Sequence, residues 1–139
     1  MFAKEYDLNS IQKITPKGQN FLMYITPRYI SHFLENEYEK ITANLISTFV
    51  EDNSIFIDVG AHYGFYSLLA AKNAKPAKII SFEPVPQNFE ILSRNIQLNG
   101  IQNVELRKEA VSDRVGERLL EITEASDNCG FYGHALSNT

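Results

Sequence analysis

An alternation of apolar and helical segments in the middle of the chain most constrains its fold. Residues 55–59, 78–82 and 104–106 are apolar runs of the length of a buried strand. Residues 65–73 and 86–98, which lie between them, are predicted helices. Short loops and right-handed crossovers place such strands side by side and parallel, in the order 3-2-1. The sequence therefore predicts an α/β fold with a three-stranded parallel sheet.

The flanking segments are less regular. Residues 1–50 are predicted to form a mainly helical lead-in segment, and residues 51–139 a partial α/β domain. A short strand is expected at residues 21–25, an amphipathic helix over 37–50 and a further strand over 117–122. The apolar stripe of that helix consists of Tyr38, Ile41, Leu45 and Phe49, widened by Ile46 and Val50.

Composition narrows the class of protein. The chain has 139 residues, which suits one domain. Its net charge of −4 argues against a protein that mainly binds the phosphate backbone of nucleic acids. We therefore expect no nucleic-acid partner. A membrane span needs about 20 apolar residues, and the apolar runs here are short. A single cysteine, Cys129, cannot form an internal disulfide. These features predict a cytoplasmic protein that does not bind membranes.

The strongest candidate site is the glycine-containing turn over residues 60–64, between the first strand and its helix. Glycines let a ligand approach the backbone, and the helix N-terminus offers unpaired N–H groups. A dinucleotide fingerprint would need glycine where His62 and Phe65 stand, and a phosphate loop would need Gly-Lys at Phe65 and Tyr66. Neither is present, and a turn without any ligand remains the alternative.

A second candidate, Glu83, ends the second strand, 25 positions after Asp58. An acidic residue at this point of a doubly wound fold accepts hydrogen bonds from ribose hydroxyls. Pro84 favours an extended backbone at Glu83, which directs the carboxylate from the strand tip. The alternative is a solvated surface glutamate.

Three segments carry a family resemblance: residues 58–68, 82–89 and 95–100. Together they resemble the FkbM family of S-adenosylmethionine-dependent methyltransferases. Residues 35–39 are similar to the lead-in helix of that family, and residues 110–113 to its segment after the third strand. The resemblance covers about residues 35–122. It implies a Rossmann-like class I methyltransferase sheet that binds S-adenosylmethionine.

The resemblance also implies residue roles. Asp58 and Gly60 would face the methionine portion, Glu83 would hold the ribose, and Asn88 would support it. The backbone near Ala110 would border the adenine. The full set of implied cofactor-binding residues is Asp58, Gly60, Ala61, Gly64, Glu83, Asn88 and Ala110.

The implied reaction is methyl transfer to oxygen of a small molecule or a glycan. The family continues with a Lys-x-Asp-x-Glu-Gly-type motif, which this sequence lacks. We therefore expect the sheet to be incomplete at its C-terminus, the chain alone to be inactive, and self-association through the uncovered edge of the sheet. The pattern indicates no metal site and no catalytic base. The pair Cys129 and His134 lacks an orienting group. A degenerate, non-catalytic binding module is the alternative.

Overall fold

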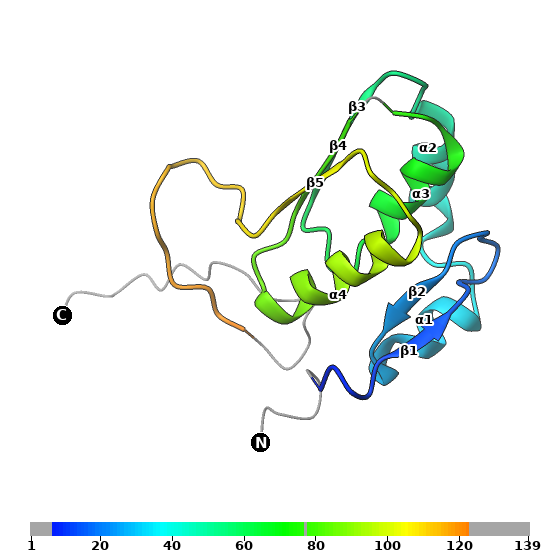
Figure 1. The fold of residues 1–139 in the computed structure, drawn as a ribbon, viewed down its shortest axis with the longest axis horizontal. Helices are drawn as coiled ribbons and strands as arrows, with labels where there is room; N and C mark the ends of the chain where they lie inside the picture. Colours follow the sequence, from blue (N-terminus) through cyan, green and yellow to red (C-terminus); the bar gives the residue numbers. More distant parts are fainter. Residues whose placement is uncertain (1–6, 77, 123–139) are drawn as a thin grey trace.

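The predicted parallel sheet is present. The structure, a computed structural model, describes residues 7–76 and 78–122. Strands β3 (Ile55–Val59), β4 (Lys78–Phe82) and β5 (Val104–Arg107) are parallel and lie in the order β3-β4-β5 (Figure 1). The three strands thus lie side by side in the order in which they follow along the chain, which confirms the predicted order 3-2-1. The register pairs the last residue of β3 with the last residue of β4, so the two carboxyl ends meet at one edge of the sheet.

Two helices connect these strands. Helix α3 (Phe65–Asn73) follows β3, and α4 (Pro86–Leu98) follows β4. Proline at the first position of α4 suits a helix start because its ring fixes the helical φ angle. Figure 1 shows both helices on the same side of the sheet. The C-terminal ends of β3 and β4 therefore open toward the N-terminal ends of α3 and α4.

The lead-in segment contains the helices that the sequence predicts, and two short strands precede them. Strands β1 (Gln12–Ile14) and β2 (Met23–Ile25) form a two-stranded antiparallel sheet. The 3-10 helix η1 (Pro27–Tyr29), α1 (Ile30–Leu34) and α2 (Lys40–Phe49) follow.

Helix α4 also holds strand β2 in place, through hydrogen bonds of one side chain. The buried Asn95 amide accepts a hydrogen bond from the Tyr24 N–H at 2.5 Å and donates one to the Tyr24 carbonyl at 3.0 Å. The same amide donates to the Tyr63 carbonyl at 2.8 Å, which ties the lead-in segment to the glycine turn. Buried side chains from the lead-in segment, α3 and α4 form one hydrophobic cluster. The fold thus fixes the position of the lead-in segment beside the sheet edge.

Helix α2 is amphipathic, but only part of its predicted stripe is packed, because Ile46 contacts the hydrophobic cluster and three other members do not. Ile41, Leu45 and Phe49 are 79%, 52% and 75% exposed, whereas the small residue Ala43 is buried. A small side chain lets α2 approach α3 closely, and the Asn73 amide donates to the Ser47 hydroxyl across this contact at 2.8 Å. The sequence pattern therefore identified the helix correctly and its packed face only in part.

The predicted strand over residues 117–122 is also wrong. Apart from an isolated bridge at residue 121, this segment has no regular structure, and Leu119 is fully exposed. Among the described residues, β3 therefore forms the edge of the parallel sheet, with Ile55, Ile57 and Val59 each more than half exposed. Within the described part of the chain, no helix is long and apolar enough to cross a membrane.

Candidate cofactor site

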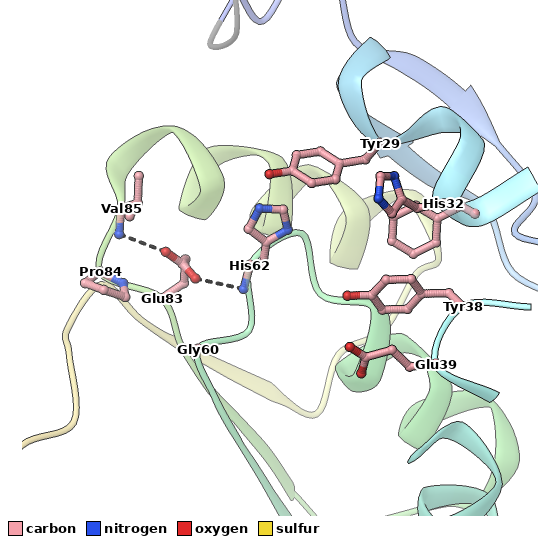
Figure 2. A pocket seen from close by; sticks show the side chains of 10 residues that line it. Tyr29, His32, Tyr38, Glu39, Gly60, His62, Glu83, Pro84 and Val85 are labelled. Atoms are coloured by element: carbon pink, nitrogen blue, oxygen red, sulfur yellow. Dashed lines mark hydrogen bonds between the residues drawn. The ribbon is translucent and has the colours of Figure 1, made fainter. Parts of the chain in front are cut away.

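A pocket of about 410 Å³ lies at the carboxyl ends of β3 and β4 (Figure 2). One wall comes from the glycine turn and from the residues that directly follow β4. The other wall comes from the lead-in segment. The lining residues are Gly60, His62, Glu83, Pro84 and Val85 on the first wall, and Tyr29, His32, Phe33, Tyr38 and Glu39 on the second. The pocket therefore joins the two predicted motifs with a wall that the sequence analysis did not include.

Glu83 is held rigidly in the first wall. The residue is buried, and its two carboxylate oxygens accept hydrogen bonds from the backbone N–H groups of His62, at 2.8 Å, and Val85, at 2.9 Å. Burial raises the pKa of the Glu83 carboxyl, and these two hydrogen bonds partly offset the shift. Asn88, also buried, donates to the same carboxylate at 3.5 Å. Glu83 is therefore not a solvated surface residue.

The backbone of the glycine turn borders the pocket. Gly60 has a φ of +77°, and its N–H and that of Ala61 both donate to the Phe82 carbonyl at 2.9 Å. A methyl group added to Gly60 would meet no atom within 4 Å, because the position faces open space. His62 follows with a φ of +52°, an unusual conformation for a residue with a side chain. The turn thus leaves a space at Gly60 that a larger residue would fill.

The other two predicted turn residues face the protein interior. Ala61 is buried in the hydrophobic cluster. Gly64, at φ +89°, precedes α3, and an added methyl group would lie 2.6 Å from Cδ1 of Leu92. These two residues shape the turn rather than line the pocket.

Asp58 lies beneath the turn, in a buried polar network. The Ser67 hydroxyl donates to its carboxylate at 2.6 Å and lies 2.7 Å from the Ser81 hydroxyl. Burial raises the pKa of Asp58, and the hydrogen bonds from Ser67 partly offset this effect. The Asp58 side chain therefore connects β3, α3 and β4 and does not line the pocket.

The raised pKa of Asp58 predicts a pH-dependent stability. Between the ordinary aspartate pKa, about 3.9, and the higher native value, the native state binds more protons than the unfolded state. The free energy of unfolding should therefore fall as pH rises through this window. Asp58→Asn keeps an oxygen acceptor for Ser67 and removes the charge, so its stability relative to the wild type should increase with pH. Urea unfolding between pH 4 and 7, with the exposed Asp113→Asn as control, measures this difference; parallel curves for Asp58→Asn and the wild type would contradict it.

The second wall is aromatic and was missed by the sequence analysis. Tyr29 packs edge-on against His62, with ring centroids 5.2 Å apart, and the His62 ring stacks on Tyr63 at 3.8 Å. Tyr38 contacts Phe33 at 4.4 Å. The sequence predicted a mainly helical lead-in segment, but not that this segment folds back over the glycine turn.

Two further predicted positions lie apart from these walls. Ala110 is half-buried, follows β5 and does not line the pocket. The candidates Cys129 and His134 fall outside the described residues. Across residues 7–76 and 78–122, no three histidine, cysteine or acidic residues cluster as metal ligands would.

Comparison with known families identifies the domain. The model of the TRM5/TYW2 methyltransferase domain matches residues 14–120, which is most of the chain. This chain belongs to the TRM5/TYW2 methyltransferase domain family. It is an S-adenosylmethionine-dependent methyltransferase domain. The pocket suits that cofactor, because a buried carboxylate and a glycine that faces open space lie on the same wall. The resemblance to the FkbM family stays a prediction.

Curated relatives of this TRM5/TYW2 domain share parts of the sequence. The methyltransferase sdnD of Sordaria araneosa is 43% identical over 47 residues, which cover 34% of this chain and 18% of that protein. An uncharacterized protein of Methanocaldococcus jannaschii is 31% identical over 75 residues, which cover 52% of this chain and 28% of that protein. The chain thus spans less than a third of the length of these relatives.

Solved structures share the fold of the TRM5/TYW2 domain. P. horikoshii TYW2 in complex with MeSAdo has a TM-score of 0.61 and 22% identity, over 78% of this chain and 39% of that one. M. jannaschii TYW2 in complex with AdoMet has a TM-score of 0.58 and 20% identity, over 70% and 42%. The complex of aTrm5 and tRNALeu has a TM-score of 0.53 and 21% identity, over 72% and 28%. The Rossmann-like methyltransferase fold is confirmed.

The prediction of a small-molecule or glycan acceptor and no nucleic-acid partner is contradicted. Structures with the same fold include a complex with tRNA and a tRNA methyltransferase of M. jannaschii. The expectation of no nucleic-acid partner relied on a net charge of −4, and the acceptor class relied on the resemblance to the FkbM family. A net charge sums over the whole chain, so it does not describe local patches, and this domain corresponds to less than half of the length of those proteins.

Proposed function

We propose that this domain transfers a methyl group from S-adenosylmethionine to a nucleotide of an RNA, with transfer RNA as the acceptor class. The observation that carries the proposal is the match to the TRM5/TYW2 domain over residues 14–120. Structures of the same fold that are described as tRNA-bound or as acting on tRNA support the acceptor class.

Glu83 is the residue we assign to the ribose of the cofactor. Oε2 of Glu83 accepts the His62 N–H and retains a lone pair, and Oε1 accepts the Val85 N–H and a long hydrogen bond from Asn88 at 3.5 Å, which leaves it able to share with a nearer donor. Ribose offers two neighbouring hydroxyl donors that match this arrangement. Asn88 positions the carboxylate through its own hydrogen bond. The buried, pre-oriented carboxylate therefore meets little ordering cost on binding.

Gly60 and the strand tips account for the rest of the cofactor contact. The open space at Gly60 lets the part of the cofactor between its ribose and its methionine portion pass close to the protein backbone. Ala110, which follows the neighbouring strand β5, is assigned to the adenine border. Asp58, Ala61 and Gly64 act indirectly, because they hold the turn in shape.

The cofactor supplies a methyl group on a positively charged sulfur, which makes the sulfur a good leaving group. What this chain contributes is orientation of donor and acceptor in line and exclusion of water. The aromatic second wall suits a planar acceptor base, because bases that leave a stack are commonly held against aromatic side chains. Tyr29 is the wall residue assigned to this contact.

The test of the RNA acceptor uses the nucleosides of cellular tRNA. In a strain that lacks the gene, mass spectrometry of digested tRNA should show the loss of one methylated nucleoside. The wild-type gene should restore it, Glu83→Ala should not, and the exposed-surface variant Glu90→Ala should. A nucleoside profile that is identical with and without the gene would reject an RNA acceptor.

A further inference from the structure

Glu39 lines the pocket in a strained backbone conformation. It precedes helix α2 with φ +40° and ψ +52°, the left-handed region that side chains other than asparagine and aspartate rarely adopt. Of the three described non-glycine residues with positive φ, two, Glu39 and His62, line this pocket. Strain of this kind is typically retained at functional sites, where the surrounding structure enforces it.

The Glu39 side chain is directed away from its own helix. It occupies the position before α2 from which polar side chains commonly cap the helix, yet it makes no capping hydrogen bond. Its carboxylate instead accepts a hydrogen bond from the hydroxyl of Tyr66, which lies on helix α3. A contact between two helices thus anchors the carboxylate at the pocket, beside the ring of Tyr38 (Figure 2).

The pocket therefore carries a carboxylate on each of two opposite sides. Figure 2 shows Glu83 on one side and Glu39 on the other, with Gly60 and His62 between them. Glu83 is buried, whereas Glu39 is exposed to the pocket opening. A ligand that is held at Glu83 by neutral hydroxyls and passes Gly60 would reach Glu39 with its far end. A carboxylate at that end favours a cationic group.

We propose that Glu39 binds the α-ammonium group at the amino-acid end of S-adenosylmethionine. The proposal rests on the assignment of Glu83 to the ribose. The ammonium group is a cation with three N–H donors, which suits an anchored carboxylate. The ring of Tyr38 adds an aromatic face beside it, and such faces attract cations. Glu39 is thus a specificity-determining residue that distinguishes the intact cofactor from its adenosine part.

Binding of three ligands by isothermal titration calorimetry tests this proposal. S-adenosylmethionine and S-adenosylhomocysteine both carry the ammonium group, whereas 5′-methylthioadenosine lacks the amino-acid end. Glu39→Gln is expected to weaken the first two ligands equally, by about fivefold to tenfold, the loss expected for a partly solvated hydrogen bond to a charged group. It should leave the affinity for methylthioadenosine unchanged.

Two further variants separate the role of Glu39 from a general change of charge or fold. Glu37→Gln removes a carboxylate two residues away that pairs with Lys40 and does not line the pocket, so all three affinities should match the wild type. Tyr66→Phe removes the hydroxyl that anchors Glu39. The affinity for the two amino-acid-bearing ligands should fall by about twofold to threefold, because the Glu39 side chain then has to be ordered when the ligand binds.

The outcomes distinguish this inference from the RNA proposal. Loss of S-adenosylmethionine affinity alone would assign Glu39 to the sulfonium and overturn the ammonium contact. Equal loss for all three ligands would show a structural role, and no loss would remove Glu39 from the site; both overturn the inference. The calorimetry contains no RNA, so an unchanged tRNA nucleoside profile would reject the acceptor and leave these binding results intact.

Discussion

Replacing Glu83 with alanine is expected to weaken S-adenosylmethionine binding by about tenfold to a hundredfold, the loss of two charge-assisted hydrogen bonds. The variant removes the ribose acceptor and the acceptor of two backbone N–H groups, those of His62 and Val85. Without that carboxylate, the turn and the strand tip lose their shared partner. The effect on binding should therefore exceed that of any single exposed residue of the pocket.

Calorimetric titration measures the affinity, and circular dichroism shows whether the variant is folded. Glu83→Gln is the stricter variant, because its amide fills the same space. One of its ends is an NH₂ donor that faces a backbone N–H donor, so it should also bind weakly. Glu90→Ala, on the exposed surface of α4, is the matched control and should bind as the wild type does. If both Glu83 variants bind with wild-type affinity, the ribose assignment is wrong.

The central sheet and the first wall of the site could be predicted from the sequence. The apolar runs at β3 and β4 have the length of buried strands, and glycine or proline marks where each following helix begins. Parallel strands with such connections allow few topologies, so the position of Glu83 beside the turn followed. Local patterns were sufficient because each of these elements is specified by its own residues.

The second wall could not be predicted in this way. Strand β1 has three residues, two of them polar, and gives no periodic signal. Glu39 reaches the pocket through a left-handed backbone and a hydrogen bond from Tyr66, 27 positions later. Helix periodicity showed that α2 is amphipathic, but the buried Ala43 determines which side packs. Each of these features depends on how distant segments pack, which a local pattern does not contain.

The two glycines of the turn should separate stability from binding. Gly64→Ala is expected to lower the free energy of unfolding by about 2–5 kcal/mol, from left-handed backbone strain together with overpacking of a buried side chain. Gly60→Ala has similar strain at φ +77° but no neighbour within 4 Å, so it should cost only about 1 kcal/mol. Because its methyl group enters the pocket, Gly60→Ala should instead weaken cofactor binding. Urea unfolding and calorimetry on both variants measure the two effects.

A double-mutant cycle with Leu92 tests the cause of the stability loss. The methyl group added at Gly64 would lie 2.6 Å from Cδ1 of Leu92, a wholly buried side chain. Leu92→Ala is itself destabilising, but it removes the overlap. In that background the cost of Gly64→Ala should fall by about 1–3 kcal/mol, the overpacking contribution, and leave the backbone strain. If the cost of Gly64→Ala in free energy of unfolding is unchanged in the Leu92→Ala background, the whole effect comes from the backbone. Equal losses of stability for Gly60→Ala and Gly64→Ala would contradict the assignment of Gly64 to packing and of Gly60 to the ligand.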